Sequence, residues 1–288
     1  NGLGCASSYE YPRVVRDPLF GARRAILIDL PGSGYSDKPE HYSYKTTDQA
    51  HVVAELIDHL KLDSFWLYGH SMGGSIAIET AGLLATRVKG LMVSEPNFHA
   101  GGGMFSRSIA AQSEQQFLEQ GYDAMLSAEK TAWAGCLQSN AAYAVWRGAS
   151  SLVAGVEPEW EAQFLSLPCP VTLIFGELSL PDDDVENLQQ KGVEVKIIPA
   201  VGHSMSWENP SALAQALAGC MTMYLLCNLS SLRKVARVSA APPGKKAATL
   251  LKHVVPDERQ AEHHAGDGNQ CSRSRGYRAR PASRKRTR

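Results

Sequence analysis

In the first third of the chain, short apolar runs are separated by a segment whose apolar residues recur with the spacing of an α-helix. Residues 25–28 and 90–93 form two such runs, and an apolar and aromatic run occupies residues 64–68. Between the runs at 25–28 and 64–68, one face of a predicted helix carries Ala50, Val53, Ile57 and Leu60. Strands joined by helices through short connections predict a parallel sheet covered on both faces.

The pattern changes between residues 98 and 168. Glycines at 101–103 form a flexible joint, and the residues beyond it have a helical period. This segment predicts an inserted helical cap over one end of the sheet. We expect the large side chains of the segment to form the core of the cap rather than a substrate wall. They are Ile109, Phe117, Tyr122, Met125, Trp133, Tyr143, Trp146 and Trp160.

The strand pattern resumes at residues 170–175 and 193–198. The second of these runs alternates apolar and polar residues, which favours a place near the edge of the sheet. An amphipathic helix then begins near Asn209 and fades near Met221. We therefore divide the chain into an α/β core (residues 1–97 and 169–221), a helical cap (98–168) and a tail (222–288).

Charge separates the tail from the rest of the chain. The 29 Lys and Arg residues balance 29 Asp and Glu residues overall. Residues 221–288 hold 15 basic and 4 acidic residues, a net +11, so residues 1–220 hold 14 and 25, a net −11. Low apolar content and like charges predict a disordered tail. We favour appended read-through or frame-shifted sequence over non-specific phosphate binding, because aromatic residues hardly interleave with the basic ones.

Six cysteines without a CxxC pair or a metal-ligand spacing favour reduced thiols in a cytoplasmic protein. No stretch approaches eighteen uninterrupted apolar residues, so we expect no membrane span. The chain opens on Asn1-Gly2-Leu3-Gly4, without an initiator Met or a signal-peptide pattern. We expect it to be a fragment.

Gly69-His70-Ser71-Met72-Gly73 links the run at 64–68 to a helix-forming segment. A Gly-x-Ser-x-Gly sequence in this context is typical of a nucleophile elbow, a strained turn that exposes the serine hydroxyl at the carboxyl end of a sheet. Glycine at the flanking positions lets neighbouring backbone approach closely. The amide of Met72 would then lie at a helix N-terminus, where negative charge is favoured. The alternative is a glycine-rich turn with a purely structural role.

A nucleophilic serine needs a base within hydrogen-bond reach and a carboxylate that fixes the tautomer of that base. Of nine histidines, His203 is the best candidate, because it follows the last predicted strand on a glycine-containing loop. His70 adjoins Ser71, but its position turns its side chain elsewhere. We expect His70 to pack or to line the pocket.

Four motifs together resemble the α/β-hydrolase superfamily over residues 1 to about 220. They are Asn1-Gly2-Leu3-Gly4, Asp29-Leu30-Pro31-Gly32-Ser33-Gly34-Tyr35-Ser36, Gly69-His70-Ser71-Met72-Gly73-Gly74 and Gly202-His203. The resemblance implies an oxyanion hole made by the amides of Met72 and Leu3. It also implies that the first strands of the fold are missing, including one between the runs at 25–28 and 64–68. We therefore expect the chain as written to be marginally stable or inactive.

The resemblance leaves the acid open. In many members the carboxylate lies three residues after the glycine of Gly176-Glu177-Leu178-Ser179, where this chain has Ser179. Haloalkane dehalogenases carry the acid after the strand that follows the elbow helix, and there this chain has Glu95. We favour Glu95 over Glu177 and over Asp182, Asp183 or Asp184. A role for Glu95 in capping the turn remains the alternative.

These features predict a serine hydrolase with Ser71 as nucleophile, His203 as base and Glu95 as acid. The expected substrate is a small-to-medium carboxylic ester, and hydrolysis of a carbon–carbon bond or an amide is less favoured. The motifs imply no metal and no organic cofactor. A non-catalytic ligand-binding protein on the same scaffold is the rival, since Ser179 and Asn1 depart from the family pattern.

Overall fold

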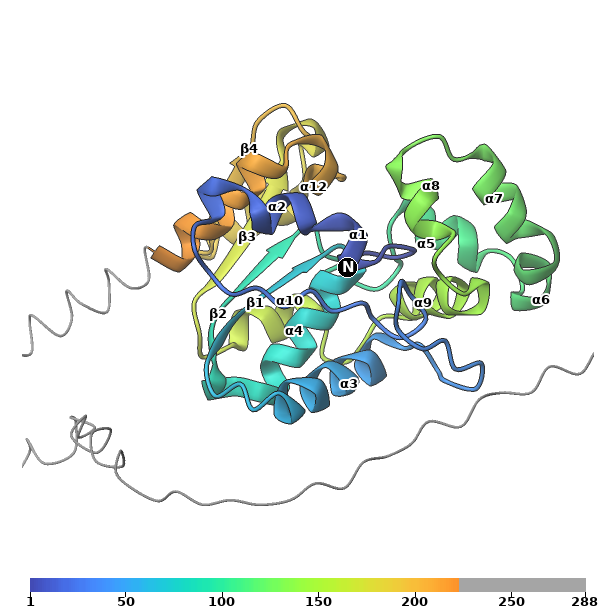
Figure 1. The fold of residues 1–288 in the computed structure, drawn as a ribbon, viewed down its shortest axis with the longest axis horizontal. Coiled ribbons are helices and arrows are strands. Elements are labelled where there is room, and N and C mark those ends of the chain that lie inside the picture. The colour runs from blue at the N-terminus through green and yellow to red at the C-terminus, as the bar shows by residue number, and fades with distance from the viewer. Residues whose placement is uncertain (223–288) are drawn as a thin grey trace, which may run out of the picture. The chain divides into compact units, whose positions relative to one another are not determined.

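The computed structural model describes residues 1–222, and its centre is a four-stranded parallel sheet (Figure 1). The strands lie in the order β1-β2-β3-β4, so the predicted parallel sheet is confirmed. The strand that we expected near an edge, β4, forms one end of the sheet. The strands are β1 (Phe65–His70), β2 (Val88–Ser94), β3 (Val171–Gly176) and β4 (Glu194–Ile198).

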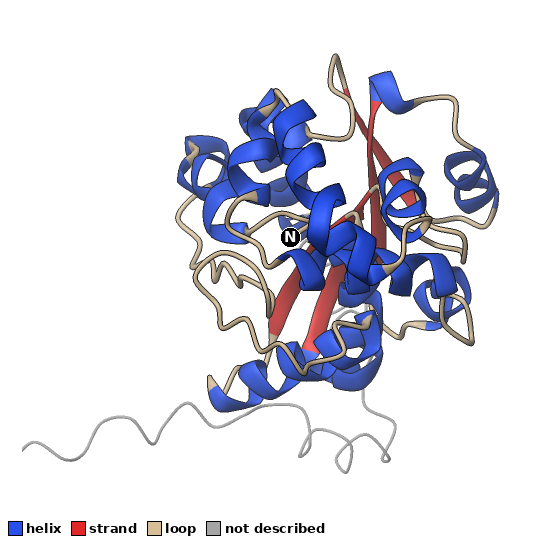
Figure 2. Cartoon of the chain, turned by 90° about the vertical axis from the view of Figure 1, so that its right-hand side faces the viewer, coloured by secondary structure: helices blue, strands red, loops and turns tan. Residues whose placement is uncertain are grey.

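Helices cover both faces of this sheet, as Figure 2 shows from the side. Along β2, Leu91 and Val93 join one apolar cluster while Met92 joins the other, because successive side chains of a strand point to opposite faces. The first face packs against α3 (Thr46–His59), α4 (Met72–Leu84), α10 (Trp160–Ser166) and α11 (Asp183–Gln190). The second packs against α2 (Pro12–Arg16), η1 (Pro18–Phe20), α12 (Met205–Glu208) and the helix over residues 210–222.

Most of the segment between residues 98 and 168 folds around its own apolar cluster. The cluster contains Ile109, Phe117 and Leu137, with Trp133 and Trp146 packed against it. Its helices are α5 (Met104–Ala110), α6 (Glu114–Gln116), η3 (Phe117–Gly121), α7 (Tyr122–Ala128), α8 (Ala132–Leu137) and α9 (Ala142–Ala154). The remaining short helices of the described chain are α1 (Ser7–Glu10), η2 (Ala85–Arg87) and η4 (Glu177–Ser179).

Trp160 is an exception to the expectation that the large side chains of this segment form the core of a cap. It is fully buried in the apolar cluster on the face of the sheet that carries Leu91 and Val93, rather than in the cluster of α5–α9. Its indole Nε1 donates to Oε1 of Glu79 on α4 at 2.8 Å. The indole therefore ties α10 to the elbow helix, a contact that the sequence period of α10 does not reveal.

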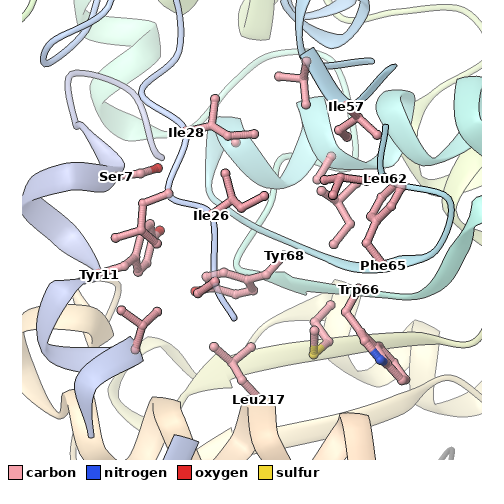
Figure 3. A pocket seen from close by; sticks show the side chains of 18 of the residues that line it. Ser7, Tyr11, Ile26, Ile28, Ile57, Leu62, Phe65, Trp66, Tyr68 and Leu217 are labelled. Carbon is pink, nitrogen blue, oxygen red and sulfur yellow. The ribbon is translucent and has the colours of Figure 1, made fainter. Parts of the chain in front are cut away.

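The expected strand at residues 25–28 is wrong. These residues pair with no strand in the described chain, and β1 pairs only with β2. An apolar cavity of about 620 Å³ lies beside β1, and Ile26, Ile28, Phe65 and Tyr68 are among the side chains lining it (Figure 3). An apolar run becomes a strand only when a neighbour accepts its backbone hydrogen bonds, and here the cavity lies where such a neighbour would be. The expected lack of the first strands stays a prediction.

The predicted tail lies outside the described residues from position 223 onward. Within residues 1–222, no helix combines the length and the apolar character that crossing a bilayer requires.

Candidate active site

The turn between β1 and α4 has the strain expected of a nucleophile elbow. Ser71 adopts φ 52° and ψ −126°, a region that non-glycine residues rarely occupy. A Cβ atom at Gly69 would lie only 2.1 Å from the carbonyl oxygen of Gly73, so no larger residue fits there. Such strain persists where the surrounding structure holds it and is concentrated at functional sites.

Backbone contacts fix the elbow at the carboxyl end of the sheet. The Ser71 amide donates to the carbonyl oxygen of Ser94, the last residue of β2, at 2.9 Å. Met72 begins α4, and the first four amides of a helix have no partner within it. The Met72 amide can therefore serve a ligand beside Ser71.

The loop over residues 1–5, called here the oxyanion loop after the role that the family resemblance implies for Leu3, lies against the elbow. A Cβ atom at Gly2 would lie 3.4 Å from the Cβ atom of Ser71. The Gly2 carbonyl oxygen accepts hydrogen bonds from the Cys5 amide at 3.1 Å and from Asn1 Nδ2 at 3.2 Å. Because N–H and C=O point to opposite sides of a trans peptide, these bonds turn the Leu3 amide away from Cys5.

Asn1 has a role that the sequence alone did not indicate. Its Nδ2 also donates to the Cys5 carbonyl at 2.9 Å, and its Oδ1 accepts from the Leu30 amide at 3.2 Å. The side chain thus joins the two ends of the oxyanion loop to the segment that follows residues 25–28. Asn1, where this chain departs from the family pattern, therefore stabilises the loop through its side-chain amide. Its partners cannot be read from the local sequence.

His203 and Glu95 form a close pair. Nδ1 of His203 lies 2.6 Å from Oε2 of Glu95, and Oε1 of Glu95 accepts from the Gly176 amide at 2.9 Å. The Glu95 side chain is 7% exposed and that of His203 is 52% exposed. A buried carboxylate held by two donors therefore fixes one ring nitrogen of a partly exposed imidazole, and the other nitrogen remains available.

The ring of His70 lies beside that of His203. It follows Gly69 directly before Ser71, and its centroid is 4.6 Å from that of His203. Burial, and then the charge of His203, lower the pKa of His70 well below its usual value, so His70 is neutral at physiological pH. Its Nδ1 lies 2.9 Å from Ser94 Oγ. His70 therefore packs beside the pair, as the sequence predicted.

Within the described residues, neither Ser71 Oγ nor His203 Nε2 makes a hydrogen bond. Catalytic hydrogen bonds are often long without substrate and shorten only in the substrate complex. The contact between Ser71 and His203 therefore stays a prediction, while the contact between His203 and Glu95 is present.

The other candidate acids have different partners. Glu177 Oε2 accepts from the Ala200 amide at 2.7 Å, and Asp182 Oδ1 caps α11. Asp184 pairs with His99, and Asp183 is exposed on α11. Within residues 1–222, Glu95 is the only carboxylate that forms a hydrogen bond or ion pair with His203.

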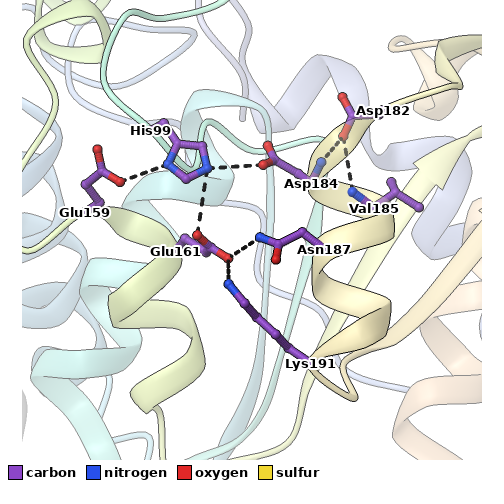
Figure 4. Close-up of polar contacts among 8 residues, drawn as sticks. All are labelled: His99, Glu159, Glu161, Asp182, Asp184, Val185, Asn187 and Lys191. Carbon is purple, nitrogen blue, oxygen red and sulfur yellow. Dashed lines mark hydrogen bonds and ion pairs between the residues drawn. The ribbon is translucent and has the colours of Figure 1, made fainter.

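His99 forms a second polar cluster, shown in Figure 4. Its Nδ1 lies 2.9 Å from Glu159 Oε2, and its Nε2 lies 3.1 Å from Asp184 Oδ1. Glu161 Oε2 is 3.9 Å from the same Nε2, and Lys191 pairs with Glu161. The hydrogen bond to Glu159 is the largest of the effects that raise the pKa of His99. The cluster links the chain leaving β2 to α10 and α11.

The described residues contain no group of three or more His, Cys, Asp or Glu side chains arranged to hold a metal ion.

Known proteins with similar sequences carry several different activities. A haloalkane dehalogenase 2 of Mycobacterium bovis is 30% identical over 99 residues, which are 33% of this chain and 35% of the relative. The matched stretch thus spans about a third of that dehalogenase. A putative 2-succinyl-6-hydroxy-2,4-cyclohexadiene-1-carboxylate synthase of Bacillus subtilis is 25% identical over 231 residues, covering 72% of this chain and 84% of the relative.

Solved structures share the fold. A thermophilic esterase from Thermogutta terrifontis superposes with a TM-score of 0.63 at 19% identity, covering 77% of this chain and 88% of the esterase. A haloalkane dehalogenase variant from Bradyrhizobium elkanii gives 0.62 at 20% identity, covering 79% and 89%. The Alpha/beta hydrolase family profile matches residues 1–216, three quarters of the chain. The chain therefore belongs to the Alpha/beta hydrolase family.

Proposed function

We propose that this protein is a serine hydrolase that cleaves small-to-medium carboxylic esters through an acyl-enzyme. The observation that carries the proposal is the hydrogen bond between His203 Nδ1 and Glu95 Oε2, 2.6 Å long, at the same end of the sheet as the strained Ser71. It leaves Nε2 of His203 for the proton of a nucleophile. The known esterase and hydrolase relatives support a hydrolytic reaction.

In the proposed reaction, Ser71 Oγ attacks the acyl carbon while His203 Nε2 takes the hydroxyl proton. Glu95 holds the ring of His203 and stabilises the imidazolium that forms. The oxyanion receives hydrogen bonds from the amides of Met72 and Leu3. As the tetrahedral intermediate collapses, the alcohol leaves with the proton of His203, and water then hydrolyses the acyl-enzyme by the same steps in reverse order.

The cap packs against the oxyanion loop at Gly148. A Cβ atom at Gly148 of α9 would lie 3.1 Å from Met72 Sδ and 3.3 Å from Leu3 Cδ1. The cap thus packs closely over both residues that we propose to donate to the oxyanion. Where such packing excludes water, hydrogen bonds to the oxyanion are stronger.

Serine as the nucleophile separates this proposal from the dehalogenase relatives. Ser71 forms an ester with an acyl group, and water hydrolyses that ester readily. Haloalkane dehalogenases use an aspartate as the nucleophile, and this chain has Ser71 at that position. We therefore propose ester hydrolysis rather than dehalogenation for this chain.

The test combines an active-site label with turnover of p-nitrophenyl acetate. A fluorophosphonate probe should label the wild type and leave Ser71→Ala unlabelled. Glu95→Gln should lose about a thousandfold or more in kcat, because the neutral amide neither fixes the tautomer nor stabilises the imidazolium. Glu177→Gln is the matched control, since Glu177 binds the Ala200 amide rather than His203. Labelling of Ser71→Ala, or equal turnover by Glu95→Gln and wild type, would refute the proposal.

A further inference from the structure

The oxyanion loop is held from two sides. On the side of the core, Asn1 and the Cys5 amide bind the Gly2 carbonyl oxygen. On the side of the cap, the Nε1 atom of Trp133 in α8 donates to the Leu3 carbonyl oxygen at 3.0 Å. The donor and the acceptor are 130 positions apart, and the Leu3 side chain also packs against the apolar cluster of the cap.

The α8 helix also leaves the loop no room to shift. Gly4 has φ +65°, and a Cβ atom there would lie 2.8 Å from Leu137 Cδ1 and 3.2 Å from the Trp133 ring. Only glycine adopts this conformation freely. Gly4, which follows Leu3, therefore packs closely against α8.

Two successive carbonyl groups of the loop are therefore fixed by different partners. The bonds to the Gly2 carbonyl fix the peptide that carries the Leu3 amide. The Trp133 bond fixes the next peptide, between Leu3 and Gly4. Without the Trp133 donor, the Leu3 carbonyl oxygen loses this partner, and the Leu3–Gly4 peptide is no longer fixed by a hydrogen bond from the cap.

We propose that Trp133 is a positioning residue, which holds the Leu3 amide in the geometry that receives the oxyanion and so couples catalysis to the position of the cap. This inference rests on the proposed function. Trp133 does not touch the reacting atoms in this account, and it acts through the Leu3–Gly4 peptide. When α8 moves away from the core, the bond to Leu3 breaks and the oxyanion hole loses its fixed shape.

The chain offers a matched control for this bond. Trp146 of α9 also donates its Nε1 to a backbone carbonyl, that of Gln112, at 2.9 Å. Both tryptophans pack against the same apolar cluster. The bond of Trp146 stays within the cap, whereas that of Trp133 crosses to the oxyanion loop.

The experiment compares Trp133→Phe and Trp146→Phe with the wild type. Steady-state hydrolysis of p-nitrophenyl acetate gives kcat and KM, and a trifluoromethyl ketone, which forms a tetrahedral adduct with the serine, reports on the oxyanion hole. Trp133→Phe should lower kcat about tenfold, a fraction of the 10²–10³ that a lost oxyanion donor costs. Its KM should stay within about twofold, and its affinity for the ketone should fall in parallel with kcat. Trp146→Phe should change neither.

A second variant tests the same hydrogen bond if Trp133→Phe does not fold. Incorporation of 3-benzothienylalanine at position 133 keeps the shape of the ring and replaces the N–H group by sulfur, so only the donor is lost. It should reproduce the lower kcat and the weaker ketone binding at an unchanged melting temperature.

The outcomes separate the two proposals. If the wild type is active but loss of the donor at position 133 leaves kcat and ketone affinity equal to those of Trp146→Phe, the role of Trp133 is refuted and the proposed function stands. If the wild type neither hydrolyses esters nor reacts with fluorophosphonate at Ser71, the proposed function is refuted and the role of Trp133 with it.

Discussion

His203 and Glu95, 108 positions apart in the chain, lie 2.6 Å apart between Nδ1 and Oε2. The carboxylate reaches the ring while its other oxygen accepts from the Gly176 amide. One side chain therefore connects the end of β2, the end of β3 and the loop after β4. The imidazole, which is half exposed, takes its orientation from this buried partner.

Shortening this carboxylate should separate orientation from charge. Glu95→Asp keeps the negative charge but withdraws the carboxyl by one methylene, so it cannot reach both the Gly176 amide and His203. We expect kcat to fall about a hundredfold, as for a misplacement of about 1 Å, and less than in Glu95→Gln. Stopped assays at several substrate concentrations should show an unchanged KM. A kcat for Glu95→Asp at or below that of Glu95→Gln would contradict this expectation.

Two glycines at opposite ends of α4, Gly69 just before it and Gly82 in its last turn, should respond in opposite directions to alanine. A methyl group at Gly69 meets the Gly73 carbonyl oxygen at 2.1 Å, so Gly69→Ala should lower both the melting temperature and the turnover. Gly82, exposed in α4, has nothing within 4 Å of its added Cβ. Gly82→Ala should therefore stabilise the protein by about 0.5–1 kcal/mol, because alanine loses less backbone entropy in a helix. Urea unfolding of both variants measures the difference, and a stabilising Gly69→Ala would contradict the proposed packing of the elbow.

Glu79 should contribute to stability rather than to chemistry. It is buried in α4, where Oε1 accepts from Trp160 Nε1 at 2.8 Å and Oε2 accepts from Thr47 Oγ1 at 2.5 Å. Glu79→Ala leaves the buried indole N–H of Trp160 without its partner, which costs about 1–3 kcal/mol, whereas Thr47 is exposed and can bind water. Glu79→Gln keeps an acceptor for the indole and should lose less. Equal free energies of unfolding for wild type and Glu79→Ala would show that these bonds carry no net stability.

The His99 cluster should make stability depend on pH. Because the folded protein raises the pKa of His99, the protonated form binds its carboxylates best in the native state. This contribution is fully present below the unfolded pKa of about 6.5 and is lost as the pH rises through the raised folded value. The free energy of unfolding of the wild type minus that of His99→Gln should therefore be larger at pH 5.5 than at pH 8.5.

Glu159→Gln is the companion variant for this measurement. It removes the partner that raises the pKa of His99 most and leaves Asp184, Glu161 and Lys191 in place. The pH dependence attributed to His99 should shrink in this background. A difference between wild type and His99→Gln that does not vary with pH would show that the cluster does not contribute through protonation.

The parts of this protein that were predictable from sequence are those with local signals. A short apolar run followed by Gly-x-Ser-x-Gly and a helix former placed Ser71 on its turn, and the alternation at 193–198 placed β4 at an edge. Glu95 was suggested as the partner of His203 by the resemblance to haloalkane dehalogenases rather than by a local signal, and the structure brings the two residues together. Their catalytic roles remain proposals.

The features that sequence did not reveal depend on distant partners. The run at 25–28 has the composition of a strand, but strand formation requires a neighbour to pair with, and pairing is not encoded in the run itself. Trp133 and Trp160 share a helical period, yet one binds the oxyanion loop and the other the elbow helix. Asn1 and His99 are single polar residues whose partners lie on other segments.

The side of β1 that faces the apolar cavity has a consequence for handling the protein. A sheet margin that meets no strand is a template on which another polypeptide can extend the ladder. Within residues 1–222, β1 is such a margin, and it adjoins the elbow that carries Ser71. We therefore expect intermolecular strand addition at β1, beside Ser71, to increase with protein concentration.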